Sequence, residues 1–381
     1  MTMVLNEDQL MLQQSARDFC REQAPISVMR GLRDNRNPDG YSEELWQAMV
    51  ELGWAGMAIP EAYGGFEFGY SGLGLVLEET GRTLVPTPLI STVLLSATLI
   101  NLAGSDEQKQ ELLPGIASGE SLMALALEET AIHNPLHIEL KAVQTGSGYI
   151  LNGSKDFVLD AHVADQLIVV ARTEGETGQQ HGISLFLVDP LSQGVDIQRL
   201  HMVDNRNAGN IQFVDVEVPA EALLGEENKG WPALSRTLDI GRIGLAAEML
   251  GGVQEVFEQT VEYMKQRTQF GVPIGAFQAL QHRAAIMYSE IELCKSLVLK
   301  ALYELDRGDA GEDMPALASM CKAKLSEVYM LVSNEGVQMH GGIGMTDEFD
   351  IGFFLKRARV AQQTLGDAVF HRDRYASLRG F

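Results

Sequence analysis

The chain has 381 residues, of which 45% are hydrophobic and 21% charged, so it can form two or three packed units with large cores. Its 52 acidic and 29 basic residues give a formal net charge of −23, which argues against general binding to nucleic acid or to anionic membranes. No run reaches the roughly 18 apolar residues of a membrane span, and residues 1–17 lack the basic and apolar regions of a signal peptide, so we expect a cytoplasmic protein.

The first part of the chain, residues 1–122, has a helical pattern. Apolar residues recur there at three-to-four spacing, as in Leu45, Met49 and Leu52. After a loop around Pro60–Gly65, further helices are expected, over Tyr70–Thr83, Ser91–Leu102 and Asp106–Ala117. This part predicts an N-terminal helical domain.

The period of the pattern changes to two in residues 123–230. Asn152-Gly153 follows an apolar run and is typical of a β-hairpin turn. Further strands are expected, over Asp165–Ala171, Ile183–Asp189 and Ile211–Val218. These features predict a middle domain similar to a β-barrel or β-sandwich.

The last part, residues 231–381, is helical again. Its long amphipathic runs predict a C-terminal four-helix bundle, with helices over Ile240–Gln266, Phe277–Arg307, Met314–Met339 and Ile351–Tyr375. The predicted fold class is therefore α+β, mainly α.

Metal and disulfide chemistry are not indicated. The three cysteines, Cys20, Cys294 and Cys321, are far apart and have neither metal nor disulfide spacing. No cluster of His, Cys, Asp and Glu has the spacing of metal ligands. We therefore expect buried, reduced cysteines and no bound metal.

Two short segments indicate binding of a large phosphate-bearing ligand. Arg267-Thr268-Gln269-Phe270-Gly271 offers a guanidinium that can fork onto phosphate oxygens, an amide, and a ring that can stack on a base or a flavin. Gln338-Met339-His340-Gly341-Gly342 places an amide before small residues, where a backbone can approach a ligand closely.

As a pair at this spacing, the two segments resemble the FAD-binding segments of the acyl-CoA dehydrogenase family. The resemblance extends over nearly the whole chain and includes the order helical domain, β domain and helical bundle. It implies a cytoplasmic flavoprotein that oxidises an acyl-CoA in fatty acid or steroid side-chain degradation, with FAD shared between two subunits. It also implies which residues face the pyrophosphate and adenosine: Arg267, Gln269, Phe270, Gln278, Gln338, Gly341 and Gly342.

The flavin-ring side departs from the family pattern. Two family stretches wrap the isoalloxazine ring, and here they read Ala126–Thr130 and Lys155–Leu159. Glu128 and Leu159 stand where the family has hydroxyl donors, and the Gly-Ser-Asp turn is replaced by Ile132–Pro135. A buried flavin atom left without its partner costs about 1–3 kcal/mol.

The catalytic carboxylate is also absent from its two family positions. Dehydrogenation needs a base for the α proton while flavin N5 accepts the β hydride. Leu365 occupies one family position of that Glu and Gly241 occupies the other, whereas Arg242 is kept and is expected near the acyl group.

Three hypotheses follow. The chain is one subunit of a heteromeric dehydrogenase in which an unlike subunit carries the base; this hypothesis suits the pattern of losses. Alternatively it is a self-sufficient homo-oligomer with a displaced base, with Asp367 the first candidate ahead of Glu348 and Asp239, although Asp367 also suits a helix N-cap. The third is a flavin-dependent oxygenase or an acyl-CoA-binding relative that needs no base. For a dehydrogenase, electron-transfer flavoprotein is the expected electron acceptor.

Overall fold

The computed structural model describes residues 4–66, 68–307 and 313–381. Contacts divide the chain into two compact units. The bundle unit comprises the described residues of 1–31, 70–85 and 242–381, and the sheet unit comprises those of 32–69 and 86–241. The predicted fold class is confirmed: helical segments precede and follow a β-sheet. The proposed domain boundaries, 1–122, 123–230 and 231–381, stay a prediction.

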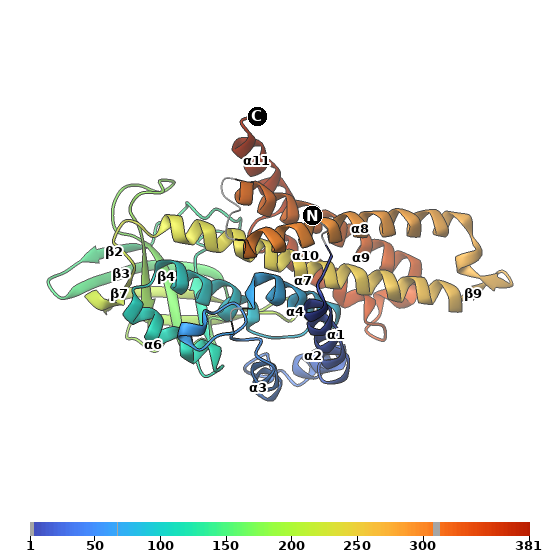
Figure 1. Ribbon diagram of the computed structural model, residues 1–381, viewed down its shortest axis with the longest axis horizontal. Helices are drawn as coiled ribbons and strands as arrows, with labels where there is room; N and C mark the ends of the chain where they lie inside the picture. The colour runs from blue at the N-terminus through green and yellow to red at the C-terminus, as the bar shows by residue number, and fades with distance from the viewer. Residues whose placement is uncertain (1–3, 67, 308–312) are drawn as a thin grey trace. The chain divides into compact units, whose positions relative to one another are not determined.

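Most of the regular structure is helical (Figure 1). The α-helices are α1 (Glu7–Glu22), α2 (Ile26–Asp34), α3 (Glu43–Glu51), α4 (Gly69–Arg82), α5 (Thr98–Ala103), α6 (Asp106–Ala117), α7 (Trp231–Gln266), α8 (Gln278–Asp306), α9 (Met314–His340), α10 (Ile351–Gln363) and α11 (Ala368–Arg379). A π-helix, η2 (Leu89–Ala97), runs directly into α5.

Helix starts follow local chemistry. The Ser105 side chain accepts from the amide of Gln108, and the Gln108 side chain accepts in return from the amide of Ser105. This capping box satisfies two amides that have no partner within α6, so α6 begins where the sequence predicts. Asn6 and Gln9 form the same arrangement at α1.

The bundle unit is organised around α9, which packs against α8, α10 and α11. The close approach of α9 to α7 depends on a glycine of α7, because a Cβ at Gly252 would lie 2.2 Å from the Tyr329 hydroxyl of α9. The crossing of α4 and α7 is equally close: a Cβ at Gly251 would lie 1.7 Å from the Glu78 carbonyl oxygen. The unit thus holds its long helices near enough for backbone contact.

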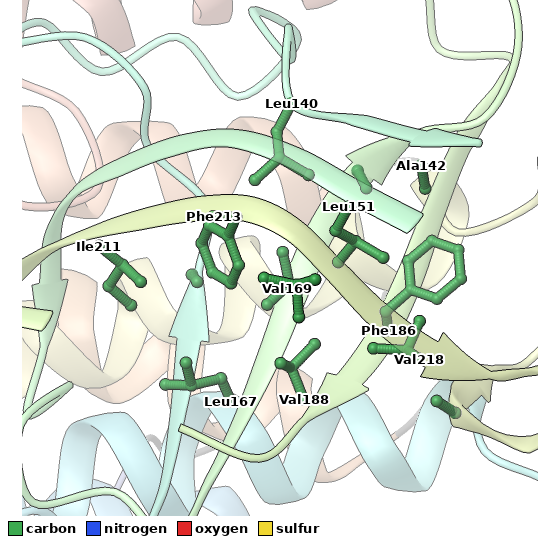
Figure 2. Packing of buried hydrophobic residues seen from close by; sticks show 14 of the residues in the cluster. Leu140, Ala142, Leu151, Leu167, Val169, Phe186, Val188, Ile211, Phe213 and Val218 are labelled. Carbon is green, nitrogen blue, oxygen red and sulfur yellow. The ribbon is translucent and has the colours of Figure 1, made fainter. Parts of the chain in front are cut away.

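The sheet unit contains one eight-stranded sheet with the order β6-β7-β3-β2-β4-β5-β8, and β1 pairs with β4. The strands are β1 (Met123–Ala126), β2 (Lys141–Gln144), β3 (Gly148–Leu159), β4 (Gln166–Arg172), β5 (Ile183–Val188), β6 (Val195–His201), β7 (Asn207–Pro219) and β8 (Leu223–Leu224). β1 and β2 run parallel to β4, and the other pairs are antiparallel. One apolar core lies on the sheet, and Figure 2 shows Leu151, Val169, Phe186 and Phe213 packed within it.

The hairpin predicted at Asn152-Gly153 is wrong. Strand β3 continues through these residues, and the turn lies earlier, where the Thr145 amide donates to the Gly148 carbonyl. Asn152-Gly153 instead forms an irregularity in the pairing of β3 with β7. Gly153 is required there because its φ is +147° and a Cβ would lie 2.8 Å from Leu140.

The single helix predicted over Ile351–Tyr375 is divided in two. Leu365 and Gly366 have φ values of +59° and +104°, which no right-handed helix permits, so α10 ends before them and α11 starts after them. This break, Thr364–Asp367, is called the base turn below because it contains the family base position.

The three cysteines are buried and free, in agreement with the sequence. Among the described residues, no helix has the length and apolar character needed to cross a membrane.

Candidate functional site

The bundle unit brings the two phosphate-binding segments to one end. Tyr263, near the end of α7, stacks on His340, the last residue of α9, with ring centroids 4.3 Å apart. The Tyr263 hydroxyl also donates to the His340 carbonyl over 3.4 Å. Because Arg267 follows Tyr263 by four residues and Gly341 follows His340 directly, both segments lie at this end (Figure 1). We call it the adenosine end.

A short hairpin exposes an aromatic ring at the adenosine end. Its strands are β9 (Thr268–Gln269) and β10 (Val272–Pro273), joined by Phe270 and Gly271 with φ values of +53° and +83°. Such a two-residue turn needs left-handed backbone at both positions, which is strained for Phe. Phe270 is nevertheless 92% exposed, so folding of this chain does not bury the ring. An exposed, strained aromatic residue indicates contact with another molecule.

The remaining residues of the adenosine end present open polar groups. Arg267, Gln269, Gln278 and Gln338 are exposed. The Arg267 side chain has no hydrogen-bond or ion-pair partner within the described residues. An added Cβ at Gly341 or Gly342 would meet nothing within 4 Å. A free guanidinium beside an uncovered glycine backbone fits the pyrophosphate of FAD.

The sheet unit brings together the two stretches expected around the flavin ring. The Asp156 amide, in β3, donates to the Glu128 carbonyl over 2.7 Å. The Glu128 carboxylate contacts His133 Nδ1 through Oε1, while its Oε2 is buried without a hydrogen-bond partner. Leu159 adds an aliphatic side chain at the end of β3. These residues supply acceptors and no hydroxyl donor, so they do not fit the acceptor atoms of the flavin edge.

One feature of the ring side does fit a flavin. Phe157, in the second stretch expected around the ring, lies in the second irregularity of β3, where its φ is +52°. Its side chain is 45% exposed, so the aromatic face is accessible. The ring side therefore keeps a stacking surface and has lost its donors.

Other charged groups of the ring side are paired within the unit. Lys155 Nζ lies 2.6 Å from the Glu129 carboxylate and is fully buried, and that burial lowers the pKa of Lys155. Asp160 accepts from the Ser91 hydroxyl over 2.5 Å. Burial raises the pKa of Asp160 to about 6, because the charged carboxylate is desolvated.

In the bundle unit, buried donors surround the base turn. Arg242 Nε donates to the Leu365 carbonyl over 3.2 Å, and His371 Nε2 lies 2.9 Å from the same oxygen. Lys322 Nζ donates to the Gln362 and Gly366 carbonyls over 3.0 and 2.8 Å. Arg242, Lys322 and His371 are all buried. The turn is therefore held firmly although Leu365 carries no acid.

The three carboxylates considered as displaced bases, Asp367, Asp239 and Glu348, either have another role or lie at other positions of the chain. Asp367 caps α11, where its Oδ1 accepts from the Phe370 amide over 2.8 Å, so the prediction of a cap is confirmed. Asp239 is buried within α7, two residues before Gly241, and Glu348 is exposed after α9. No carboxylate stands at 365 or 241, and Arg242 follows Gly241 directly.

Sequence reasoning missed Lys322. A signal was present, because Lys322 shares a helical face with Ala318, Leu325 and Tyr329, which are all buried. A lysine on an apolar stripe needs buried acceptors, and here the carbonyls around the base turn supply them.

Among the described residues, no group of His, Cys, Asp and Glu could hold a metal ion.

Known proteins agree with this arrangement. Models of the acyl-CoA dehydrogenase N-terminal, middle and C-terminal domains match residues 6–120, 126–216 and 228–377. The caffeyl-CoA reductase-Etf complex subunit CarC of Acetobacterium woodii is 30% identical over 365 residues, covering 94% of each chain.

Solved structures give the same result. Butyryl-CoA dehydrogenase from Megasphaera elsdenii superposes with a TM-score of 0.91 at 30% identity, over 100% of both chains. A variant of the steroid ACAD Tcur3481-Tcur3483 superposes with a TM-score of 0.87 at 32% identity, over 98% of both chains. The chain therefore belongs to the acyl-CoA dehydrogenase family, the FAD-dependent oxidoreductases that act on CH–CH groups.

Proposed function

We propose that this chain is the subunit of a heteromeric acyl-CoA dehydrogenase that completes the FAD site of an unlike partner. The partner carries the glutamate base and the flavin-ring pocket. Together the two chains remove the α proton and the β hydride of an acyl-CoA thioester. FAD, when bound, would supply the acceptor for the hydride.

One observation carries the proposal: the adenosine end offers open groups to a ligand, whereas the base turn has no acid. Arg267 and Phe270 are exposed, and an added Cβ at Gly341 would meet nothing within 4 Å. At the base turn, by contrast, Leu365 has replaced the acid and Asp367 is occupied as a helix cap. A surface that binds the adenosine half of FAD beside a site without a base suits a supporting subunit.

The self-sufficient alternative requires Asp367 to leave its cap. Its carboxylate accepts from the amide of Phe370, and the Leu365 and Gly366 carbonyls beside it are held by Arg242, His371 and Lys322. Rebuilding this turn would lose several buried hydrogen bonds at once, and small displacements are costly in catalysis. The flavin oxygenase alternative is tested by oxygen uptake with reduced flavin.

The names of two relatives support the proposed partner proteins. The steroid ACAD Tcur3481-Tcur3483 carries a paired designation, and CarC is named as part of a complex with Etf. We therefore propose an unlike acyl-CoA dehydrogenase subunit as the assembly partner, in a cytoplasmic heterotetramer. Electron-transfer flavoprotein is the proposed electron acceptor.

Co-expression tests the proposal. This chain is produced alone and together with a homologue that has Glu at the base position, and FAD is measured by absorbance after desalting. We expect little FAD on the chain alone and about one FAD per pair of unlike subunits in the complex, with bleaching of the flavin by acyl-CoA without oxygen. A homo-oligomer with one tight FAD per chain and full turnover would refute the proposal.

A further inference from the structure

A set of buried side-chain donors holds the backbone carbonyls in and beside the base turn. The Leu365 carbonyl receives Arg242 and His371, and Lys322 bridges the carbonyls of Gln362 and Gly366. Lys322 makes one further hydrogen bond, to the Ser326 hydroxyl over 3.2 Å, so all three of its ammonium hydrogens are used. The lysine is fully buried and spans the turn from one end to the other.

The turn is also strained. Leu365 has a φ of +59°, a left-handed conformation that side chains with a Cβ rarely adopt. Such strain persists only where the surroundings enforce it, and it is found mainly at functional sites. Here the side chain that the strain orients is an aliphatic one, 8% exposed, which performs no acid–base chemistry.

We propose that Lys322 is a positioning residue that holds the base turn in the shape a catalytic carboxylate at position 365 requires, so that the turn is intact and only its acid is missing. This inference rests on the proposed function, which makes residue 365 the base position. It goes further in stating that, within the base turn, the loss is confined to one side chain.

Lys322 is the member of the set that decides the shape. Arg242 and His371 hold a single oxygen at the middle of the turn, whereas Lys322 joins a carbonyl on the last turn of α10 to the carbonyl before Asp367. It therefore fixes the distance between the two ends. Burial and the neighbouring Arg242 lower the pKa of Lys322 to about 7, so its charge, and with it the strength of both bonds, changes near neutral pH.

Amide hydrogen exchange on the assembled protein tests the role of Lys322. In Lys322→Met we expect the Thr364 and Gly366 amides, which donate to Val360 and Gln363, to exchange at least about tenfold faster, with the amides in the middle of α9 unchanged. The matched control is Lys324→Met, two residues along α9, where the lysine pairs with Glu290 of α8. Unchanged exchange at the turn, or an equal rise throughout α9, α10 and α11, would overturn the proposal.

A pH series on the unaltered protein supplies a second measurement in case Lys322→Met folds poorly. Protection of the Gly366 amide, corrected for its intrinsic exchange rate, is expected to fall several-fold between pH 6 and pH 8, as charge-assisted bonds become neutral ones. Arg242, Asp367 and His371 face the same turn, and any dependence they cause should persist in Lys322→Met. A flat profile in the unaltered protein would contradict the proposal.

Restoring a carboxylate at position 365 tests whether this residue stands at the base position. In a complex whose partner has Gln in place of its base Glu, and with the ring side of this chain repaired by Glu128→Thr and Leu159→Thr, we expect Leu365→Glu to raise α-proton exchange of butyryl-CoA in D₂O at least about tenfold. Adding Lys322→Met should then lower kcat about tenfold with KM within twofold, since a misplaced base reacts slowly while binding is unaffected. If Leu365→Glu adds no activity while the exchange results hold, the assignment of residue 365 fails and the positioning role of Lys322 stands.

Discussion

The two halves of the expected FAD site differ in how their polar groups are satisfied. At the adenosine end, the Arg267 side chain has no partner from the described part of the chain, and an added Cβ at Gly341 or Gly342 would meet nothing within 4 Å. On the ring side, Glu128 contacts His133, Glu129 contacts Lys155 and Asp160 contacts Ser91. Exposed groups such as Arg267 bind water and stay available to a ligand, whereas groups that are paired within the unit are not available.

This difference suggests why substitutions are tolerated better on the ring side than at the adenosine end. Substitutions on the ring side, such as Glu128 and Leu159, are accommodated by contacts within the sheet unit and leave only one carboxylate oxygen, Glu128 Oε2, without a partner there. At the adenosine end the Arg267 side chain has no such contact with the described residues, so we expect a change of Arg267 to act on a bound cofactor directly.

The largest expected effect tests the adenosine end. Arg267→Ala should weaken FAD retention by the assembled complex about 10- to 100-fold, because a charge-assisted contact contributes about 1.5–3 kcal/mol. Arg267→Lys should recover only part, since the planar bidentate geometry is lost. Flavin content after desalting is the measurement.

The control for Arg267 is Lys265→Ala. Lys265 is exposed two residues earlier and pairs with Glu262 of the same helix. Equal flavin content in the unaltered protein and in Arg267→Ala would contradict the assignment of Arg267 to the pyrophosphate. An equal loss of flavin in Lys265→Ala would show that the effect of Arg267→Ala is a general effect of charge.

The second effect tests the internal pairing of the ring side. The pKa of Asp160 is raised from 3.8 to about 6, so the folded state favours the protonated acid and loses stability as the pH rises from 4 to 6. Asp160→Asn keeps the shape and removes this loss. We expect its free energy of unfolding at pH 7 to rise by about 1–3 kcal/mol, with a smaller change between pH 4 and pH 6.

Denaturant unfolding at several pH values measures the effect of Asp160→Asn. The control is Asp196→Asn, which alters an exposed carboxylate of β6. A stability that falls at pH 7 in Asp160→Asn would show that the charged carboxylate is needed where it lies, and the pairing with Ser91 would then have another role.

How far the sequence predicts this molecule depends on whether the deciding contacts are local. The start and end of α6 are predicted correctly because Ser105 and Gln108 cap it within four residues. Asn152-Gly153 has the composition of a hairpin turn, yet the contact that decides its conformation is with Leu140, in a different segment. Lys322 likewise acquires its role from carbonyls forty or more residues away, at Gln362 and Gly366.

The candidate site shows the same division. The adenosine segments were predicted together because each is a short run with its own chemistry, and the stacking of Tyr263 on His340 brings them to one end. The partner of Glu128, by contrast, could not be predicted, because His133 reaches it only through the fold of an irregular loop.

A smaller effect is expected from repairing the ring side. Glu128→Thr with Leu159→Thr returns hydroxyl groups to the two family positions, and each new hydrogen bond to the flavin contributes about 0.5–1.5 kcal/mol. FAD retention by this chain should rise several-fold. Glu139→Thr, an exposed site, is the control for the loss of a negative charge. No gain in flavin would mean that the ring side differs from the family in its backbone as well.

The smallest expected effect concerns Asp367. If Leu365 and Gly241 mark a site without a base, Asp367→Asn should leave turnover of the complex almost unchanged, because the side chain serves as a helix cap. Asn caps nearly as well as Asp, so only the interaction of the charge with the helix dipole is lost, about 1 kcal/mol or less of stability. If Asp367 is instead a displaced base, the same isosteric change removes the proton acceptor and should lower the rate about 100-fold or more. Turnover and α-proton exchange, measured on the same preparation as the unfolding midpoint, separate the two. A collapse of α-proton exchange with an unchanged midpoint would favour a self-sufficient enzyme over a supporting subunit.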